Sequence, residues 1–189
     1  MKKNVHVWHL EFTDGRAIAP PPPNKPYELR QAGRNLPELN RMLYVAVGAQ
    51  WLWYERLKWS YREWQLFLDR PNIETWIAFD GGTPIGYFEL EAQAGAAAEI
   101  CYFGLLPEFI GQGFGGHLLR DAIAKAWQLG GERVWLHTCT LDHPSALKNY
   151  QARGFSVFKE EDIIANLPDE PIQPWPGANK PEISWSDNR

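Results

Sequence analysis

The chain has 189 residues, of which 44% are hydrophobic, and carries a formal net charge of −4 at pH 7. This length suffices for one domain with its own core. The acidic balance argues against a nucleic-acid-binding or membrane-surface protein. No apolar run approaches the length of a membrane span, and the N-terminus lacks the apolar core of a signal peptide. We therefore expect a cytoplasmic protein without nucleic-acid or membrane partners.

Two helices are predicted early in the chain. Residues 5–12 alternate between two faces and predict a strand before them. Pro37 occupies the first position of a helix, where its missing N–H costs nothing. The expected buried stripe of this helix is Leu39, Met42, Leu43, Ala46 and Val47. Ser60 and Glu63 form a capping box, which starts a second helix.

The remaining pattern alternates strands with helices. Strands are predicted at 73–79, 84–91, 98–105, 133–140 and 155–158. Apolar residues at helical spacing predict a helix from 118 to 129, which Gly130–Gly131 ends, and Gly154 ends a shorter helix that Pro144 begins. This order predicts one α+β domain, residues 1–165, around a mixed sheet. Five prolines predict an irregular, Pro-rich C-terminal tail at 166–189.

A glycine-rich turn joins the strand at 98–105 to the helix that follows it. Glycine lets backbone N–H groups approach a ligand without an intervening Cβ, and the N-terminus of a helix carries a partial positive charge. Together they predict a phosphate or pyrophosphate site. The spacing Gly111-x-Gly113-x-x-Gly116 also matches the dinucleotide fingerprint. However, neither Glu132 nor Asp142 stands where the acidic residue of that motif belongs, which disfavours NAD.

Two motifs together resemble the GNAT superfamily of acetyl-CoA-dependent N-acyltransferases. The family signature Gln/Arg-x-x-Gly-x-Gly/Ala corresponds to Ile110–Gly115, with Ile110 in place of the usual Gln or Arg. The later Tyr-x-x-x-Gly-Phe element corresponds to Tyr150–Phe155. Two helices and a strand meander precede the first motif, as residues 37–105 do here. The resemblance implies a GNAT-like α+β fold with a mixed, mainly antiparallel central sheet flanked by helices.

The resemblance also implies acetyl-CoA as cosubstrate and assigns residues to it. The pyrophosphate would lie on the backbone N–H groups of Gly111, Gln112, Gly113, Phe114, Gly115 and Gly116. The pantetheine arm would run along the strand end at Phe103, Leu105 and Leu106, where a backbone N–H near Leu105 would serve the oxyanion. His143 stands where the family often has an asparagine that contacts the pantetheine.

Two residues are candidates for acid–base chemistry. Tyr150 matches the family tyrosine that protonates the CoA sulfur, and its alternative is a core tyrosine. Glu99 lies in an apolar strand, where desolvation would raise its pKa towards that of a useful base. Its alternative is a solvated glutamate at the strand edge. His137 and Cys139 share one strand face, but they do not form a defined ligand set, so no metal is expected.

The leading hypothesis is an N-acetyltransferase that moves an acetyl group directly to a primary amine. A small molecule or an amino acid is the favoured acceptor, because Trp51, Trp53, Trp59 and Trp64 are candidates to line a pocket, although they equally suit a core. The alternative is a non-catalytic acyl-CoA-binding module. The sequence leaves a homodimer open, and it predicts that Cys101 and Cys139 are reduced thiols.

Overall fold

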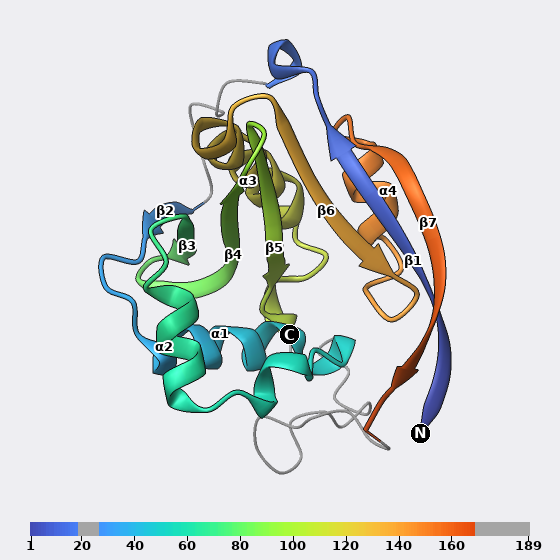
Figure 1. Ribbon diagram of the computed structural model, residues 1–189. Helices are drawn as coiled ribbons and strands as arrows, with labels where there is room; N and C mark the ends of the chain where they lie inside the picture. Colours follow the sequence, from blue (N-terminus) through green and yellow to red (C-terminus); the bar gives the residue numbers. More distant parts are fainter. Residues whose placement is uncertain (19–26, 169–189) are drawn as a thin grey trace, which may run out of the picture.

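The structure is a computed structural model that describes residues 1–18 and 27–168 (Figure 1). The proline run at 20–23 lies outside the described residues, as does the predicted tail from residue 169 onward. The described strand β7 ends at Asn166, and Leu167 beyond it is buried, with 4% of its surface exposed.

A sheet of seven strands forms the centre of the described chain. The strands are β1 (Lys2–Phe12), β2 (Glu28–Gln31), β3 (Ile73–Asp80), β4 (Thr83–Gln93), β5 (Ala97–Leu105), β6 (Arg133–Cys139) and β7 (Ser156–Asn166). Their order across the sheet is β2-β3-β4-β5-β6-β1-β7. Only the β5–β6 pair is parallel among the described pairs. The predicted mixed, mainly antiparallel sheet is confirmed.

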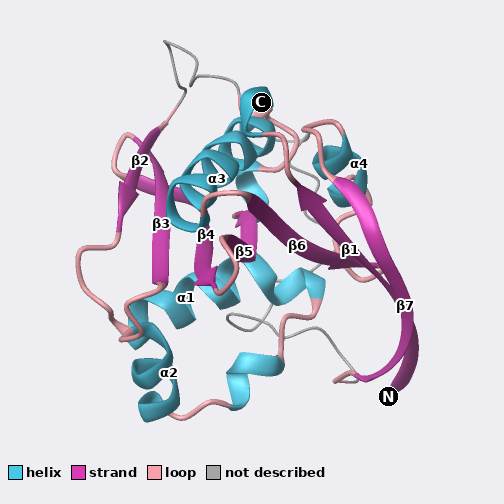
Figure 2. Ribbon diagram, turned by 45° about the horizontal axis from the view of Figure 1, so that its top comes forward, coloured by secondary structure: helices cyan, strands magenta, loops and turns pink. Residues whose placement is uncertain are grey.

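Helices cover both faces of the sheet (Figure 2). They are α1 (Pro37–Gly48), α2 (Tyr61–Leu68), α3 (Phe114–Gly130) and α4 (Ala146–Gln151). Neighbouring side chains of a strand point to opposite faces, so Ile77 packs in the cluster of α1 while Ala78 packs in that of α3. None of the described helices is long and apolar enough to cross a membrane.

Several predicted helix boundaries agree with the structure, but α3 begins at Phe114, before residue 118, and α4 begins at Ala146, two residues after Pro144. Pro37 begins α1. Ser60 Oγ accepts the Glu63 backbone N–H at 3.3 Å, and the Glu63 carboxylate accepts the Ser60 N–H at 2.6 Å, which completes the predicted capping box. Gly131 and Gly154 have positive φ angles of 94° and 91° after α3 and α4, as expected of helix-ending glycines.

Three local predictions were wrong or incomplete. Met42 was expected in the buried stripe of α1 but is 52% exposed, because Asn40 and Leu43 lie on the face that meets the sheet. The last strand does not end at residue 158: its polar part continues to Asn166 as an edge strand paired with β1. The sequence also gave no signal for β2, which has four residues and is mostly polar.

The N-terminal strand β1 pairs with strands from the C-terminal half of the chain. β1 lies between β6 and β7, with Val7 opposite Cys139 and His9 opposite His137 (Figure 1). The amino group of Met1 donates a hydrogen bond to the Leu167 carbonyl at 2.6 Å. The first and last described segments therefore form one ribbon beside β6.

A buried ion pair joins α1 and the segment after it to the sheet. Arg56 Nη1 donates to Glu89 Oε1 at 2.7 Å, and the two side chains are 9% and 1% exposed. Asn40 donates to the other Glu89 oxygen at 3.3 Å. The Arg56 guanidinium lies over the rings of Phe67 and Tyr102, 4.0 and 4.3 Å from their centres. These contacts fix α1 and the segment that follows it against the sheet.

Replacing Arg56 with methionine is expected to destabilise the fold strongly. The change leaves the Glu89 carboxylate buried without a counter-charge, which should lower the free energy of unfolding by about 3–5 kcal/mol. Urea unfolding followed by circular dichroism measures this loss. The control is Arg30→Met, which removes the exposed Arg30–Glu28 pair and should leave the midpoint unchanged. Equal midpoints for the two variants would contradict the role of the buried pair.

Candidate active site

A cleft opens in the middle of the sheet where β5 and β6 diverge. The two strands pair only over residues 97–99 and 133–135 (Figure 1). On the β4 side, Leu90 faces Ile100 and Glu89 faces Tyr102, so Cys101 is a bulge without a partner. A bulge bends its strand and increases its twist. Beyond Glu99, the edge of β5 that faces β6 has no partner among the described strands.

The cleft has a volume of about 570 Å³. The glycine turn lines one end together with α4, through Ile110, Gly111, Gly113, Gly115 and Gly116. The segment from Trp51 to Glu55, which follows α1, lines the other end, and we call this the acceptor end. Val5, Val7, Ile163 and Ala165 from the β1–β7 ribbon add to the wall. Because β1 lies between β6 and β7, two of its side chains form part of the cleft wall.

The glycine turn has the conformation that its sequence predicts. Gly111 and Gly113 have φ angles of 83° and 87°, which only glycine adopts without strain. A Cβ at either position would have no atom of the described residues within 4 Å, so conformation rather than space requires glycine. Gly113 is the N-cap of α3, whose first turn holds no acidic residue. The first N–H groups of a helix lack partners within it, so this turn offers donors and positive charge to an anion.

Arg153 adds a full positive charge at this end, and the sequence analysis did not identify it. Its Nε donates to the Gly116 carbonyl at 3.0 Å and its Nη1 to the Asn149 carbonyl at 3.1 Å. Arg153 is the only arginine or lysine among the described residues that line the cleft. It directly precedes Gly154 in the Tyr-x-x-x-Gly-Phe element, a position that the motif leaves open.

Most of the predicted cofactor residues line the cleft. They are Phe103, Leu105, Gly111, Gly113, Gly115, Gly116 and His143. Three predicted residues do not line it. Leu106 packs on the α1 cluster, the Gln112 amide donates to the Glu108 carbonyl at 2.7 Å, and the Phe114 ring lies 5.9 Å from that of Phe109. His143 lies next to the segment that lines the acceptor end, with its ring 5.3 Å from that of Trp51.

Comparison with known proteins agrees with this architecture. The model of the acetyltransferase (GNAT) family matches residues 36–155. This range contains the glycine turn and the whole Tyr-x-x-x-Gly-Phe element. The chain belongs to the GNAT acetyltransferase family. No curated protein matches the chain.

Solved structures share the GNAT fold with this chain. A conserved protein of unknown function from Staphylococcus epidermidis is 15% identical with a TM-score of 0.60, over 86% of this chain and 62% of that one. A GCN5-related N-acetyltransferase from Sphaerobacter thermophilus is 17% identical with a TM-score of 0.57, over 86% and 53%. An aminoglycoside acetyltransferase from a soil metagenome is 16% identical with a TM-score of 0.52, over 68% and 87%. The chain thus spans little more than half the length of the first two.

Tyr150 of this GNAT protein lies on α4 and lines the cleft. The residue is 8% exposed, and its ring lies 6.2 Å from that of Phe103 and 6.0 Å from that of Phe155. Its hydroxyl has no hydrogen-bond partner among the described residues. Burial, assisted by the charge of Asp142, raises the pKa of Tyr150 well above its usual value. The hydroxyl therefore keeps its proton at neutral pH.

Glu99 lies on β5 at the closed end of the opening. Its carboxylate accepts a hydrogen bond from the Gln93 amide at 2.9 Å and is 15% exposed. Burial, with the nearby charge of Glu91, raises the pKa of Glu99 to about 7. Glu99 does not itself line the cleft, but His137 does, and its Nδ1 lies 3.9 Å from Glu99 Oε1. The imidazole therefore stands between Glu99 and the cleft.

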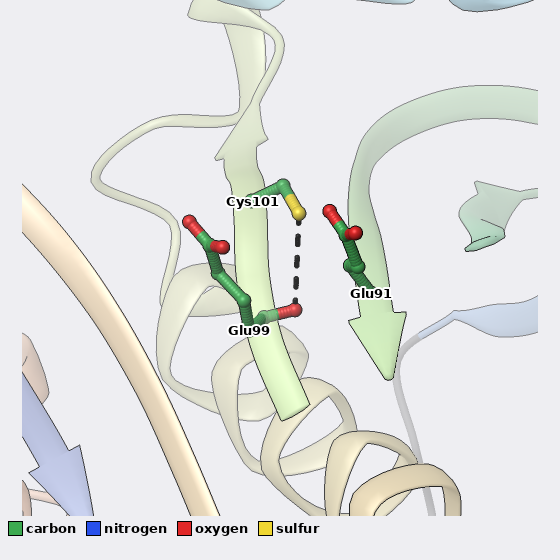
Figure 3. Close-up of side chains that lie close together, drawn as sticks. All are labelled: Glu91, Glu99 and Cys101. Atoms are coloured by element: carbon green, nitrogen blue, oxygen red, sulfur yellow. Dashed lines mark hydrogen bonds between the residues drawn. The ribbon is translucent and has the colours of Figure 1, made fainter. Parts of the chain in front are cut away.

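A second feature of this region is a group of two carboxylates and a thiol. Glu91, Glu99 and Cys101 place their side-chain ligand atoms within 4.8 Å of one another (Figure 3). The sequence analysis did not identify this trio, because Glu91 comes from β4 and the other two from β5. Burial raises the pKa of Cys101 well above its usual value, so the side chain is a thiol rather than a thiolate. A thiolate is the form that binds metals, so this set suits a metal poorly.

Replacing Gly113 with alanine is expected to impair the turn and its anion site. A left-handed alanine should cost about 1–2 kcal/mol in the free energy of unfolding. Displaced N–H groups should weaken coenzyme A binding about tenfold, as measured by calorimetry. The control is Gly81→Ala, because Gly81 also has a positive φ (53°) and open space around it but lies in the β3–β4 turn. Equal coenzyme A affinities in both variants would show that the turn does not hold the ligand.

Proposed function

We propose that this protein transfers an acetyl group from acetyl-CoA to the nitrogen of a small primary amine. The observation that supports this most is the cleft between β5 and β6. It brings the glycine turn, the unpaired β5 edge and Tyr150 into one space. The turn and Arg153 would hold the pyrophosphate. The edge of β5 at Phe103 and Leu105 would hold the pantetheine arm. Acetyl-CoA would supply an acyl group already activated as a thioester.

Tyr150 is the proposed general acid. Amide formation expels a thiolate, which is stabilised by gaining a proton. The Tyr150 hydroxyl is protonated, lines the cleft, and has no competing hydrogen bond among the described residues. It can therefore donate to the departing sulfur.

Glu99 is the proposed general base, acting through His137. The nitrogen of the acceptor amine must lose a proton for the amide to form. A base whose pKa lies near the working pH removes this proton most effectively. The pKa of Glu99, about 7, meets this requirement. Partial burial lowers the pKa of His137, so its imidazole is neutral and suited to pass a proton from the cleft to the carboxylate. This relay requires the 3.9 Å between His137 Nδ1 and Glu99 Oε1 to shorten to hydrogen-bond length when substrate binds.

Neither described cysteine suits a covalent acetyl-enzyme. Burial raises the pKa of Cys139 to about 11 and that of Cys101 well above its usual value. Both remain thiols at neutral pH, whereas a nucleophile must be a thiolate. These values support direct transfer from the thioester to the amine.

Replacing Tyr150 with phenylalanine is expected to lower kcat about 100-fold, because a general acid contributes this much or more. Coenzyme A affinity should not change. Release of free thiol from acetyl-CoA, over a panel of amines, measures kcat. The control is Tyr61→Phe on α2, since Tyr61 is 60% exposed and outside the cleft. Unchanged kcat in Tyr150→Phe would refute the acid role. Tight binding of coenzyme A by the wild type, without thiol release over any amine, would favour a binding module.

The pH profile of kcat/KM tests the base. Below its pKa Glu99 is protonated and cannot accept a proton, so the rate should rise with pH and level off above about 7. Dividing the wild-type profile by that of Glu99→Gln cancels the ionisation of the substrate and should isolate this rise. Glu91→Gln removes a charge that raises the pKa of Glu99, so it should shift the rise to lower pH. A ratio that does not vary with pH would exclude Glu99.

A further inference from the structure

The acceptor end of the cleft is rich in aromatic side chains. Trp51, Trp53 and Tyr54 line it, and each is only partly buried, so part of each side chain remains accessible. Tyr102 of β5 also lines the cleft and packs directly against Trp53, with the two ring centres 4.9 Å apart. Such walls favour a flat, apolar body, and their ring faces attract cations.

The charges at this end are negative. Glu55 and Asp142 line the cleft, and Asp142 is held in place by Thr138 Oγ1 at 2.6 Å and the Cys139 N–H at 3.0 Å. Glu161 of β7 lies nearby and contacts His9 at 2.7 Å. The charges of Asp142, Glu55 and Glu161 all favour protonation of His137, which places these three carboxylates within electrostatic reach of that ring.

No described lysine or arginine lines the cleft at this end, and Lys58 lies beside it but outside the lining, with its Nζ 5.4 Å from the centre of the Tyr54 ring. Arg153 is the sole lysine or arginine of the described lining, and it is bound to the Gly116 carbonyl at the opposite end. Lys159 does not line the cleft and contacts Glu161 at 2.9 Å. A substrate carboxylate held inside this end of the cleft would therefore lie among like charges without a cation in the described lining, which opposes binding.

We infer that the acceptor is a monocationic primary amine with an aromatic or bulky apolar body and no carboxylate. In chemical terms it is the decarboxylated counterpart of an apolar amino acid. The ammonium group would be drawn to the carboxylates as it enters, and the body would lie on the Trp51–Tyr54 wall. This inference rests on the proposed acetyl transfer to an amine and narrows it, since amino acids themselves would be poor acceptors.

Matched pairs of acceptors test the inference by turnover. With acetyl-CoA, kcat/KM for tryptamine and for phenethylamine should exceed that for tryptophan and for phenylalanine by at least about 30-fold. Glu55→Lys places a cation at the acceptor end and should reduce this preference about tenfold. The control is Glu132→Lys, which makes the same charge change at an exposed position outside the cleft and should keep the preference. An unchanged preference in Glu55→Lys would overturn the role of the acidic cleft.

Equilibrium binding tests the same preference without turnover. Calorimetric titration of the coenzyme A complex should show phenethylamine binding at least about tenfold more tightly than phenylalanine. Equal or tighter binding of phenylalanine would overturn the inference even if some amine is acetylated. Tighter binding of phenethylamine with no thiol release over any amine would support the inference about the site and refute the proposed transfer. Failure of the acceptor inference and failure of the proposed acetyl transfer therefore give different results.

Discussion

The divergence of β5 from β6 is the constraint on which the site depends. Two neighbouring strands normally satisfy each other's backbone groups along their whole length. Here they do so over three residues and then separate, with a bulge at Cys101 on the other side of β5. The separation leaves an open strand edge beside the glycine turn and α4, which Arg153 joins. One irregularity thus creates the cleft, its hydrogen-bonding edge and the approach to Tyr150.

Burial sets the protonation states of the groups around this opening. The same loss of water raises the pKa of Glu99 to about 7, keeps the Tyr150 hydroxyl protonated and prevents Cys101 from becoming a thiolate. Each shift favours acid–base chemistry and disfavours a thiolate nucleophile. The buried Arg56–Glu89 pair packs against Tyr102, which lines the cleft. The contacts that stabilise the fold therefore also support the cleft wall.

Much of the fold could be predicted because its signals are local. The capping box at Ser60, the proline at the start of α1 and the glycines after α3 and α4 each act within one turn of chain. The predicted last strand ended too early because Lys159 to Asp162 are polar. An edge strand needs no apolar pattern when its partner strand supplies the hydrogen bonds. Strand β2 is short and polar, and it was not predicted for the same reason.

The sequence by itself determined the family, the glycine turn and the identity of Glu99 and Tyr150 as candidates, because the residues of each motif lie close together in the chain. Only the tertiary structure decided how these parts meet. It inserted β1 between β6 and β7, placed His137 in front of Glu99, and brought Arg153 to the glycine turn. The acidic, aromatic acceptor end likewise combines residues from distant segments. Such juxtapositions depend on long-range packing and have no counterpart in local spacing.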